Sequence, residues 1–298
     1  MLNQDGRIKA MDTEPEPGSP AVSSLSSSTP PSRTWQLRTQ WAVLVIATVL
    51  CLSLSTQSGV NPLVIGSVLL ASAVSSIAGF AFSAVCGAML FHLSGDPVQI
   101  VQIMIVCSVA NQTAMVWSLK REIQWRELTV FLIGGAVGLP VGITVLLTLD
   151  RHVYTHVLGA FLVLYGCYML ARKPLVIGRQ ATAFDAFAGF LGGITGGAAG
   201  FPGAFVTIWC GFKGWNKGRQ RAMFQPFILI MQVAALAAIS LLRHSSGKVG
   251  FDPAILLCIP ASLLGTTVGM TLYQRLSDNH FARAVNLLMI ASGISYFA

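Results

Sequence analysis

The chain of 298 residues is 54% hydrophobic and only 10% charged, and its mean hydropathy is +0.68. These values exclude an ordinary soluble globular protein and predict an integral membrane protein. The formal net charge of +8 does not indicate nucleic-acid binding, because the basic residues lie in short loops between apolar segments, where they orient a membrane protein. The six cysteines occur singly with no CxxC pair, so the sequence predicts neither a disulfide framework nor a metal or other cofactor.

Residues 1–40 are rich in Pro, Ser and Glu and contain few apolar residues. Such a segment cannot bury enough apolar surface to fold, so we expect a disordered tail. It lacks the apolar region and the small-residue cleavage site of a signal peptide. We therefore expect a cytoplasmic tail.

Apolar runs that approach the length of a membrane-spanning helix, about 20 residues for a hydrocarbon core of about 30 Å, follow this tail. The seven runs lie at 41–57, 98–119, 128–149, 153–171, 224–242, 253–273 and 281–298. Seven spanning helices are therefore the minimum, and 41–57 is an extra helix before the part of the chain that repeats.

The chain aligns with itself in two halves, roughly 62–173 and 181–298. SSIAGFAFSAVCGA at 75–88 lies over GGITGGAAGFPGAF at 192–205 with an offset of 117, which grows to 120 at Gln112 and Gln232 and then to 127. The last section pairs two ladders of small residues, Gly134, Gly138 and Gly142 with Ala261, Gly265 and Gly269. Small residues four apart let helix backbones approach closely, so we interpret both ladders as packing surfaces.

Positive charges distinguish two topologies. The run at 62–93 has 32 residues, and one straight helix of that length, about 48 Å, would exceed the hydrocarbon core. If every run crosses once, the basic residues divide 11 inside and 8 outside. If 62–93 and 184–211 each return to the side from which they entered, the division is 16 inside and 3 outside. The positive-inside rule favours the second topology, in which the two halves are inverted, as in many secondary transporters.

The segment 192–205 places glycines and a proline where a broken helix is most costly. Glycine permits close approach and positive φ, and proline prevents a continuous helix. We therefore predict a re-entrant turn whose amides hold an anion, with close helix packing as the alternative. The candidate substrate-binding residues here are Gly196, Gly197, Gly200 and Pro202, with Gly79 and Ser83 at the corresponding points of the first half. A P-loop is excluded because no Lys-Ser or Lys-Thr follows.

Two inverted halves, each opening with an apolar segment of the type AGFxxG or GGxxGxxGFPGAF and later carrying a GxxxG helix, resemble the sulfite exporter TauE/SafE family of membrane permeases. The resemblance covers roughly residues 62–298. It implies transport of sulfur-containing anions such as sulfite or organosulfonates across the bacterial inner membrane, driven by an ion gradient. FAFSAVCG departs from the family pattern, with Phe80 and Phe82 in place of glycines and Val85 in place of proline.

Neutral amides lie within two apolar runs, Asn111 and Gln112 in the first half and Gln225 and Gln232 in the second. Polar side chains in spans are costly and often functional, and amides can donate hydrogen bonds to sulfonate oxygens without fixing a charge. Interhelical hydrogen bonding is the alternative. Arg221, with Arg219, is a candidate for drawing an anion to the cytoplasmic mouth.

Ion coupling and metal binding are weakly indicated. The carboxylates lie in the tail, in loops or at helix edges, so Asp185 and Asp96 are weak candidates for coupling. His152 and His156 lie one turn apart, a spacing that can bind metal. Because no third ligand is in view, we interpret them as residues at the edge of a helix.

The sequence therefore predicts an all-α membrane protein of two inverted repeats, acting as a secondary transporter for small sulfur-containing anions rather than as an enzyme. Its partners would be a small-molecule anion and the lipid bilayer, and formation of a homo-oligomer stays open. An intramembrane hydrolase is the first alternative, but no serine has a histidine partner in a recognisable motif. A scaffold that does not transport is the second. The exact substrate, the direction and the coupling ion are not determined by the sequence.

Overall fold

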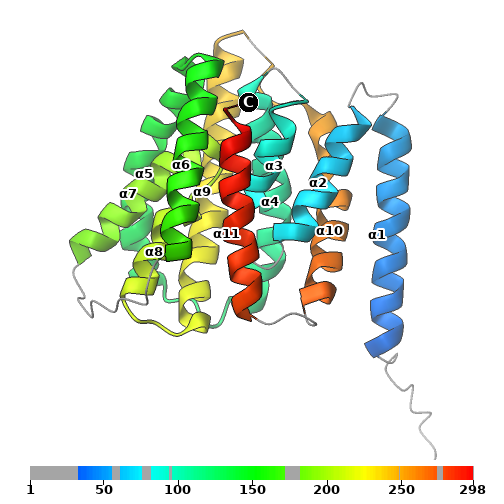
Figure 1. Ribbon diagram of the computed structural model, residues 1–298, viewed down its shortest axis with the longest axis horizontal. Helices are drawn as coiled ribbons and strands as arrows, with labels where there is room; N and C mark the ends of the chain where they lie inside the picture. Colours follow the sequence, from blue (N-terminus) through cyan, green and yellow to red (C-terminus); the bar gives the residue numbers. More distant parts are fainter. Residues whose placement is uncertain are drawn as a thin grey trace, which may run out of the picture. The chain divides into compact units, whose positions relative to one another are not determined.

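A computed structural model of the chain describes residues 33–55, 61–75, 82–93, 96–171, 182–247, 249–273 and 278–297. All regular structure in these ranges is helical (Figure 1). The helices are α1 (Arg33–Ser55), α2 (Pro62–Ser75), α3 (Phe82–Leu90), α4 (Pro97–Leu119), α5 (Trp125–Thr148), α6 (Arg151–Ala171), α7 (Thr182–Ala199), α8 (Gly203–Phe212), α9 (Lys217–Ser245), the 3₁₀ turn η1 (Pro253–Leu257), α10 (Cys258–Tyr273) and α11 (Asp278–Ser295).

The protein is an all-α membrane protein, and each of the seven expected runs falls on a helix. Within the described ranges, parts of α4, α5, α6 and α9 are long and apolar enough to cross a membrane, and the remaining apolar helices are shorter. Helix α1 begins at Arg33, earlier than the expected start at 41, because RTWQLRTQ contains neither Gly nor Pro and continues the helix. Residues 1–32 of the expected tail lie outside the described residues.

Helices α7 and α8 form an antiparallel hairpin. Asp185, in the first turn of α7, lies 2.7 Å from the Nζ atom of Lys213, which follows the last residue of α8. The start of one helix therefore meets the end of the other. Gly200 forms the bend with φ of +63°, a conformation that favours glycine. In Figure 1, α8 returns to the lower edge, whereas α3 and the start of α2 lie at the upper edge.

The fourth helix of each half packs on the first helix of the other half. Helix α5 packs most extensively on α7, and α10 packs on α2. A Cβ atom on Gly138 of α5 would lie 2.0 Å from the Phe190 carbonyl oxygen of α7, and one on Gly265 of α10 would lie 2.2 Å from the Leu69 carbonyl oxygen of α2. Gly138 and Gly265 therefore bring backbone against backbone, as expected from the spacing of the ladders.

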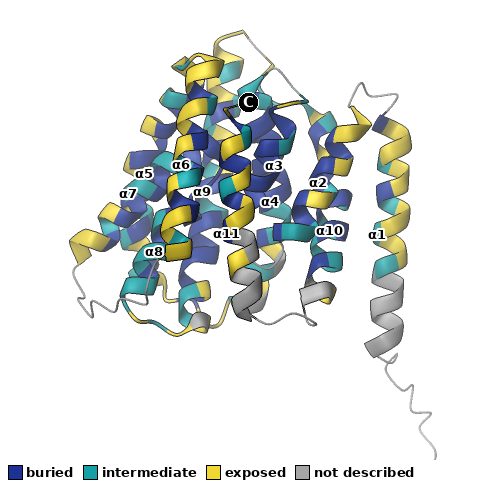
Figure 2. Cartoon of the chain, viewed as in Figure 1, coloured by how far each residue is buried: buried dark blue, intermediate teal, exposed yellow. Residues whose placement is uncertain are grey.

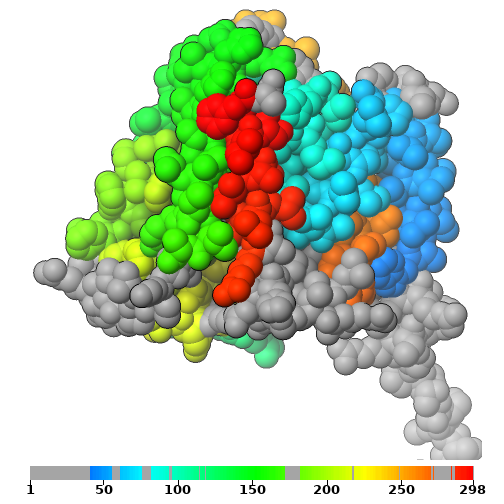
Figure 3. All heavy atoms as spheres, viewed as in Figure 1, coloured from blue at the N-terminus to red at the C-terminus, as the bar shows by residue number. Residues whose placement is uncertain are grey.

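The remaining long helices pair across the halves as well. Helix α4 packs on α9, and α6 packs on α11, which lie side by side on the face shown in Figure 3. Figure 2 shows α3 and α4 mostly buried and α6 with a largely exposed outer face. Exposed apolar side chains on α6, such as Val153, Val157 and Leu164, are typical of a surface that contacts lipid.

Local sequence fixes several helix starts. Asp96 caps α4 by accepting a hydrogen bond from the Val98 amide, and Pro97 occupies the first helical position. Asn216 caps α9 by accepting from the Arg219 amide. These side chains satisfy amides that have no partner within the helix. The caps therefore fix where α4 and α9, the two helices that carry the polar amides, begin.

Candidate functional site

The carbonyl group at the bend of the α7–α8 hairpin receives a hydrogen bond from each half of the chain. Ser83 Oγ, at the start of α3, donates to the Gly200 oxygen over 2.8 Å. Gln232 Nε2, on α9, donates to the same oxygen over 3.0 Å. Ser83 and Gln232 are 4% and 1% exposed. The bend therefore lies at a buried point where α3, α7 and α9 meet.

A second group of polar side chains joins α4 to α10 and α2. Asn111 Nδ2 donates to Ser262 Oγ over 2.8 Å. Ser262 Oγ also lies 3.0 Å from Ser72 Oγ of α2. Beside this group is a small cavity of about 20 Å³, lined by Ser75, Phe82, Ser108, Asn111, Gln112, Met115 and Thr266. It has room for about one water molecule.

Three buried amide oxygens have no hydrogen-bond partner among the described residues: Asn111 Oδ1, Gln225 Oε1 and Gln232 Oε1. A buried polar atom without a partner is costly. Among the described residues, the Gln225 Nε2 atom donates to the sulfur of Met115 alone, over 3.7 Å. That bond is weak, so both polar atoms of the Gln225 side chain are poorly satisfied in this structure. These residues come from the same two helices, α4 and α9, in which the sequence predicted them.

The glycines before the bend have packing roles. Gly197 faces α5, where a Cβ atom would lie 2.6 Å from the Leu139 carbonyl oxygen. Gly196 faces Pro202, and a Cβ atom on Gly196 would lie 2.9 Å from the Cβ atom of Pro202. The amides of Gly200 and Phe201 donate back to the carbonyl groups of Gly196 and Thr195. At this bend the carbonyl of Gly200 accepts bonds, whereas the sequence suggested amides that hold an anion.

The expected partner of this segment in the first half is only partly visible. Gly79 lies outside the described residues, which resume at Phe82. Ser83 is described and contacts the bend directly. The separation of Ser83 and Gly200 along the chain is 117 residues, the same as the offset at which the two segments align.

The profile of the sulfite exporter TauE/SafE family matches residues 64–296. The chain belongs to this family. Comparison with curated proteins and with solved structures gives no match. Membership makes this protein a membrane transporter, and the match extends from α2, without its first two residues, to the end of α11.

In this TauE/SafE protein, the two basic residues considered at the start of α9, Arg219 and Arg221, differ in exposure and in contacts. Arg221 is exposed on the first turns of α9. Arg219 is engaged: its Nη2 atom lies 2.8 Å from the Glu127 carboxylate, and its guanidinium lies over the Trp215 ring at 4.3 Å. Arg221 is therefore the more exposed of the two, and its role in attracting an anion stays a prediction.

The two aspartates considered for coupling are both engaged in this family member. Asp185 is 7% exposed and accepts hydrogen bonds from Trp209 and Lys213, which close the base of the hairpin. Asp96 pairs with Arg243 at 2.8 Å besides capping α4. Neither lies in the polar group around Gly200. The sequence did not predict the Asp185–Lys213 pair, because the two residues meet only when the hairpin closes.

Other residues near the site of this TauE/SafE protein gave no signal in the sequence. Ser75, Ser108 and Thr266 line the small cavity, but single hydroxyl residues are common in apolar helices. Tyr154 OH donates to the Ala198 carbonyl oxygen in the last turn of α7, over 2.7 Å. Its position in an apolar helix indicated only packing.

One histidine lies beside a serine that is distant in the sequence. His92 Nε2 lies 2.7 Å from Ser295 Oγ, a pair that no sequence motif joins. A nucleophilic pair needs a third group that orients the histidine ring. Among the described residues, no carboxylate forms an ion pair with His92.

Proposed function

We propose that this protein is a secondary transporter for small sulfur-containing anions, such as sulfite or organosulfonates, built from two inverted repeats that meet at Gly200. The observation that carries the proposal is the Gly200 carbonyl, at a break in a helix and hydrogen-bonded by Ser83 from one half and Gln232 from the other. Transporter sites commonly lie where broken helices of two repeats meet. The family of the chain supports the same function.

Contacts between the halves support the repeat. The packing of α5 on α7 becomes that of α10 on α2 when the halves are exchanged. The same exchange relates two contacts between α6 and α11: a Cβ atom on Gly159 would meet the Gly293 carbonyl oxygen, and one on Gly166 would meet the Asn286 carbonyl oxygen. Ser83 and Gly200, which occupy equivalent positions, contact each other. A two-fold axis passing between Ser83 and Gly200 accounts for all these contacts.

The lining of the site suits an anion that must be released again. Asn111, Gln112, Gln225 and Gln232 carry neutral amides, which can donate hydrogen bonds without holding a full opposite charge. The N–H groups of Asn111 and Gln232 donate to Ser262 and Gly200 in this structure, so they must exchange partners to bind an anion. The adjacent cavity of about 20 Å³ is too small for sulfite, so binding requires the helices to move apart. Exchange of conformation between two inverted halves would supply that movement from either side.

The orientation that we propose places the N-terminus in the cytoplasm of a bacterium, with the protein in the inner membrane. Sixteen of the 19 Lys and Arg residues then lie on the cytoplasmic side, in agreement with the positive-inside rule. The hairpin of α7 and α8, whose two ends meet at Asp185 and Lys213, supports the re-entrant path on which this count depends.

Flux measurements in liposomes test the function. The purified full chain is reconstituted, and uptake of labelled sulfite, sulfoacetate and a carboxylate is measured with and without a proton gradient. We expect uptake of the sulfur-containing anions that exceeds uptake of the carboxylate. Gln232→Ala and Arg221→Ala should reduce uptake, whereas Gln124→Ala, at an exposed loop position, should not. Absence of flux for every anion would contradict the proposal.

Cysteine labelling tests the topology separately. Lys120→Cys and Ser246→Cys are made in a chain whose exposed Cys167 is replaced by Ala. A membrane-impermeant maleimide should label Ser246→Cys in intact cells and Lys120→Cys only after the membrane is opened. Labelling of Lys120→Cys in intact cells would exclude the re-entrant topology.

A further inference from the structure

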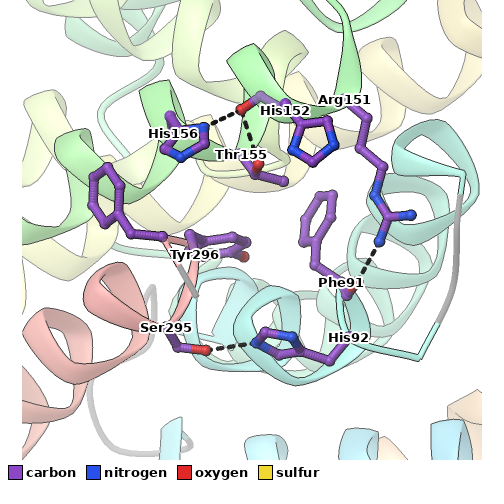
Figure 4. Close-up of a pocket in the computed structure, with 9 residues that line it drawn as sticks. Phe91, His92, Arg151, His152, Thr155, His156, Ser295 and Tyr296 are labelled. Carbon is purple, nitrogen blue, oxygen red and sulfur yellow. Dashed lines mark hydrogen bonds between the residues drawn. The ribbon is translucent and has the colours of Figure 1, made fainter.

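A second polar pocket lies at the end of the bundle where α3 ends, α6 begins and α11 ends. It has a volume of about 310 Å³, and Figure 4 shows its lining. The lining residues are Phe91, His92, Arg151, His152, Thr155, His156, Ser295, Tyr296 and Phe297. They come from three segments that are far apart in the sequence. The pocket is distinct from the polar group around Gly200.

The lining combines one guanidinium and three imidazoles, and it contains no carboxylate side chain among the described residues. Asp150 and Asp96, the acidic residues nearest to Arg151 and His92 along the chain, have other contacts. Asp150 accepts a hydrogen bond from the His152 amide over 3.1 Å, and Asp96 pairs with Arg243. A guanidinium and imidazole N–H groups are donors for oxyanions. The pocket is therefore electrostatically suited to an anion.

The basic side chains are held in place by neighbouring groups. Arg151 Nη2 donates to the Phe91 carbonyl oxygen over 2.8 Å. His92 is fixed by its bond to Ser295, and His156 Nδ1 faces the His152 carbonyl oxygen. Within the described part of the chain, no group of three His, Cys, Asp or Glu side chains is placed to hold a metal ion. This arrangement favours an anion over a cation as the ligand.

Aromatic rings close the pocket toward the bundle interior. The Phe91 ring lies 5.2 Å from the Tyr296 ring and 5.7 Å from the Tyr154 ring, measured between centroids. Beneath them, Tyr154 donates to the Ala198 carbonyl oxygen in the last turn of α7. Tyr296 OH is buried and has no hydrogen-bond partner among the described residues. An aromatic layer thus separates the pocket from the bend at Gly200.

We propose that this pocket binds a small oxyanion, sulfite or a short organosulfonate, before the anion passes the aromatic layer. Arg151 would meet the anion oxygens, with His92 and His152 beside it. A volume of about 310 Å³ is many times that needed for one water molecule, so it accommodates such an anion with part of its hydration. The role in loading rests on the proposed transport function, whereas binding itself does not.

Protection of the histidines from chemical modification tests binding without any transport. The full chain in detergent is treated with diethylpyrocarbonate in sodium sulfate or in sodium chloride of equal ionic strength, and modification of each histidine is measured by mass spectrometry. We expect sulfate to slow modification of His92 and His152 roughly threefold or more. His244, an exposed histidine at the end of α9 and outside the pocket, is the internal control and should be unaffected. Equal rates in both salts at the pocket histidines would overturn the proposal.

Two further arms define the ligand and the residue that binds it. Arg151→Gln keeps a hydrogen-bond donor but removes the charge, and it should abolish the protection, whereas His244→Gln should leave it intact. Protection that appears without sulfate when phosphatidylglycerol vesicles replace phosphatidylcholine vesicles would show a lipid-headgroup site and would overturn the proposal for a free anion.

Side-specific flux tests the loading role. In vesicles, Arg151→Gln should raise the half-saturating sulfite concentration roughly 3- to 10-fold when sulfite is presented from the side of the pocket. The value from the opposite side should stay unchanged, since the pocket lies at one end of the bundle. An equal change from both sides would refute the loading role. Absence of flux in the unmodified protein would refute the proposed function and leave the protection result to decide the pocket.

Discussion

Replacing Gly138 by Ala should force α5 and α7 apart. The added Cβ atom would lie 2.0 Å from the Phe190 carbonyl oxygen and 2.9 Å from its carbonyl carbon, whereas ordinary contact begins near 3.4 Å. To relieve this clash, α5 and α7 must move apart by about 1.4 Å, because a helix backbone cannot move aside by changing rotamer as a side chain can. Overpacking of this kind costs about 1–3 kcal/mol.

A matched substitution isolates that packing cost. Gly66 lies within α2, and a Cβ atom there would meet nothing within 4 Å. Both substitutions gain the higher helix propensity of Ala, about 1 kcal/mol, so this gain cancels in the comparison. Gly138→Ala should therefore be less stable than Gly66→Ala by about 1–3 kcal/mol.

Unfolding in mixed micelles, followed by tryptophan fluorescence, measures the difference. Gly265→Ala provides a second reading, since its Cβ atom would lie 2.2 Å from the Leu69 carbonyl oxygen on α2. We expect it to lose stability as Gly138→Ala does. If Gly138→Ala and Gly66→Ala unfold at the same midpoint, the backbone contact between α5 and α7 does not limit the packing, and the reasoning is wrong.

Further substitutions test the hairpin and its bend by the same unfolding assay. Ser83→Ala and Gln232→Ala should each lower the free energy of unfolding by about 1 kcal/mol. The loss in the double variant should differ from the sum of the two single losses, because both bonds reach one carbonyl. Strict additivity would contradict a shared acceptor. Asp185→Asn leaves a buried ammonium without its carboxylate and should lower the free energy of unfolding by about 3–5 kcal/mol. Glu127→Gln, in a partly exposed pair, should lower it by at most about 1 kcal/mol. Equal losses would contradict the difference in burial between the two pairs. Tyr154→Phe should cost about 1 kcal/mol and is contradicted by an unchanged midpoint.

The sequence predicted the spans and the break because both depend on local composition. Seven apolar runs fall on helices, and the glycines with Pro202 mark the bend between α7 and α8. Glycine spacing likewise predicted the close packing of α5, since Gly138 and its neighbours in the ladder meet the backbone of α7. Such signals need no knowledge of which helix is the partner.

The roles of individual glycines could not be predicted in the same way. Gly197 and Gly200 lie three residues apart, yet one packs on α5 and the other adopts positive φ. What differs is the element that faces each residue, and the sequence does not give it. The pocket around Arg151 was missed for a related reason, because His92 and Ser295 are 203 residues apart along the chain and no local pattern joins them.

The exchange of partners between the two halves has a consequence for how the chain acquires its structure. The glycine face of α5 is covered by α7, and α2 is covered by α10, so residues 62–173 expressed alone would leave both surfaces open to lipid. We expect such a fragment to stay unfolded and to be degraded when it is expressed alone. It should fold when residues 181–298 are supplied at the same time as a second polypeptide. During synthesis, the first half therefore stays incompletely packed in the membrane until the ribosome has made the helices that cover it.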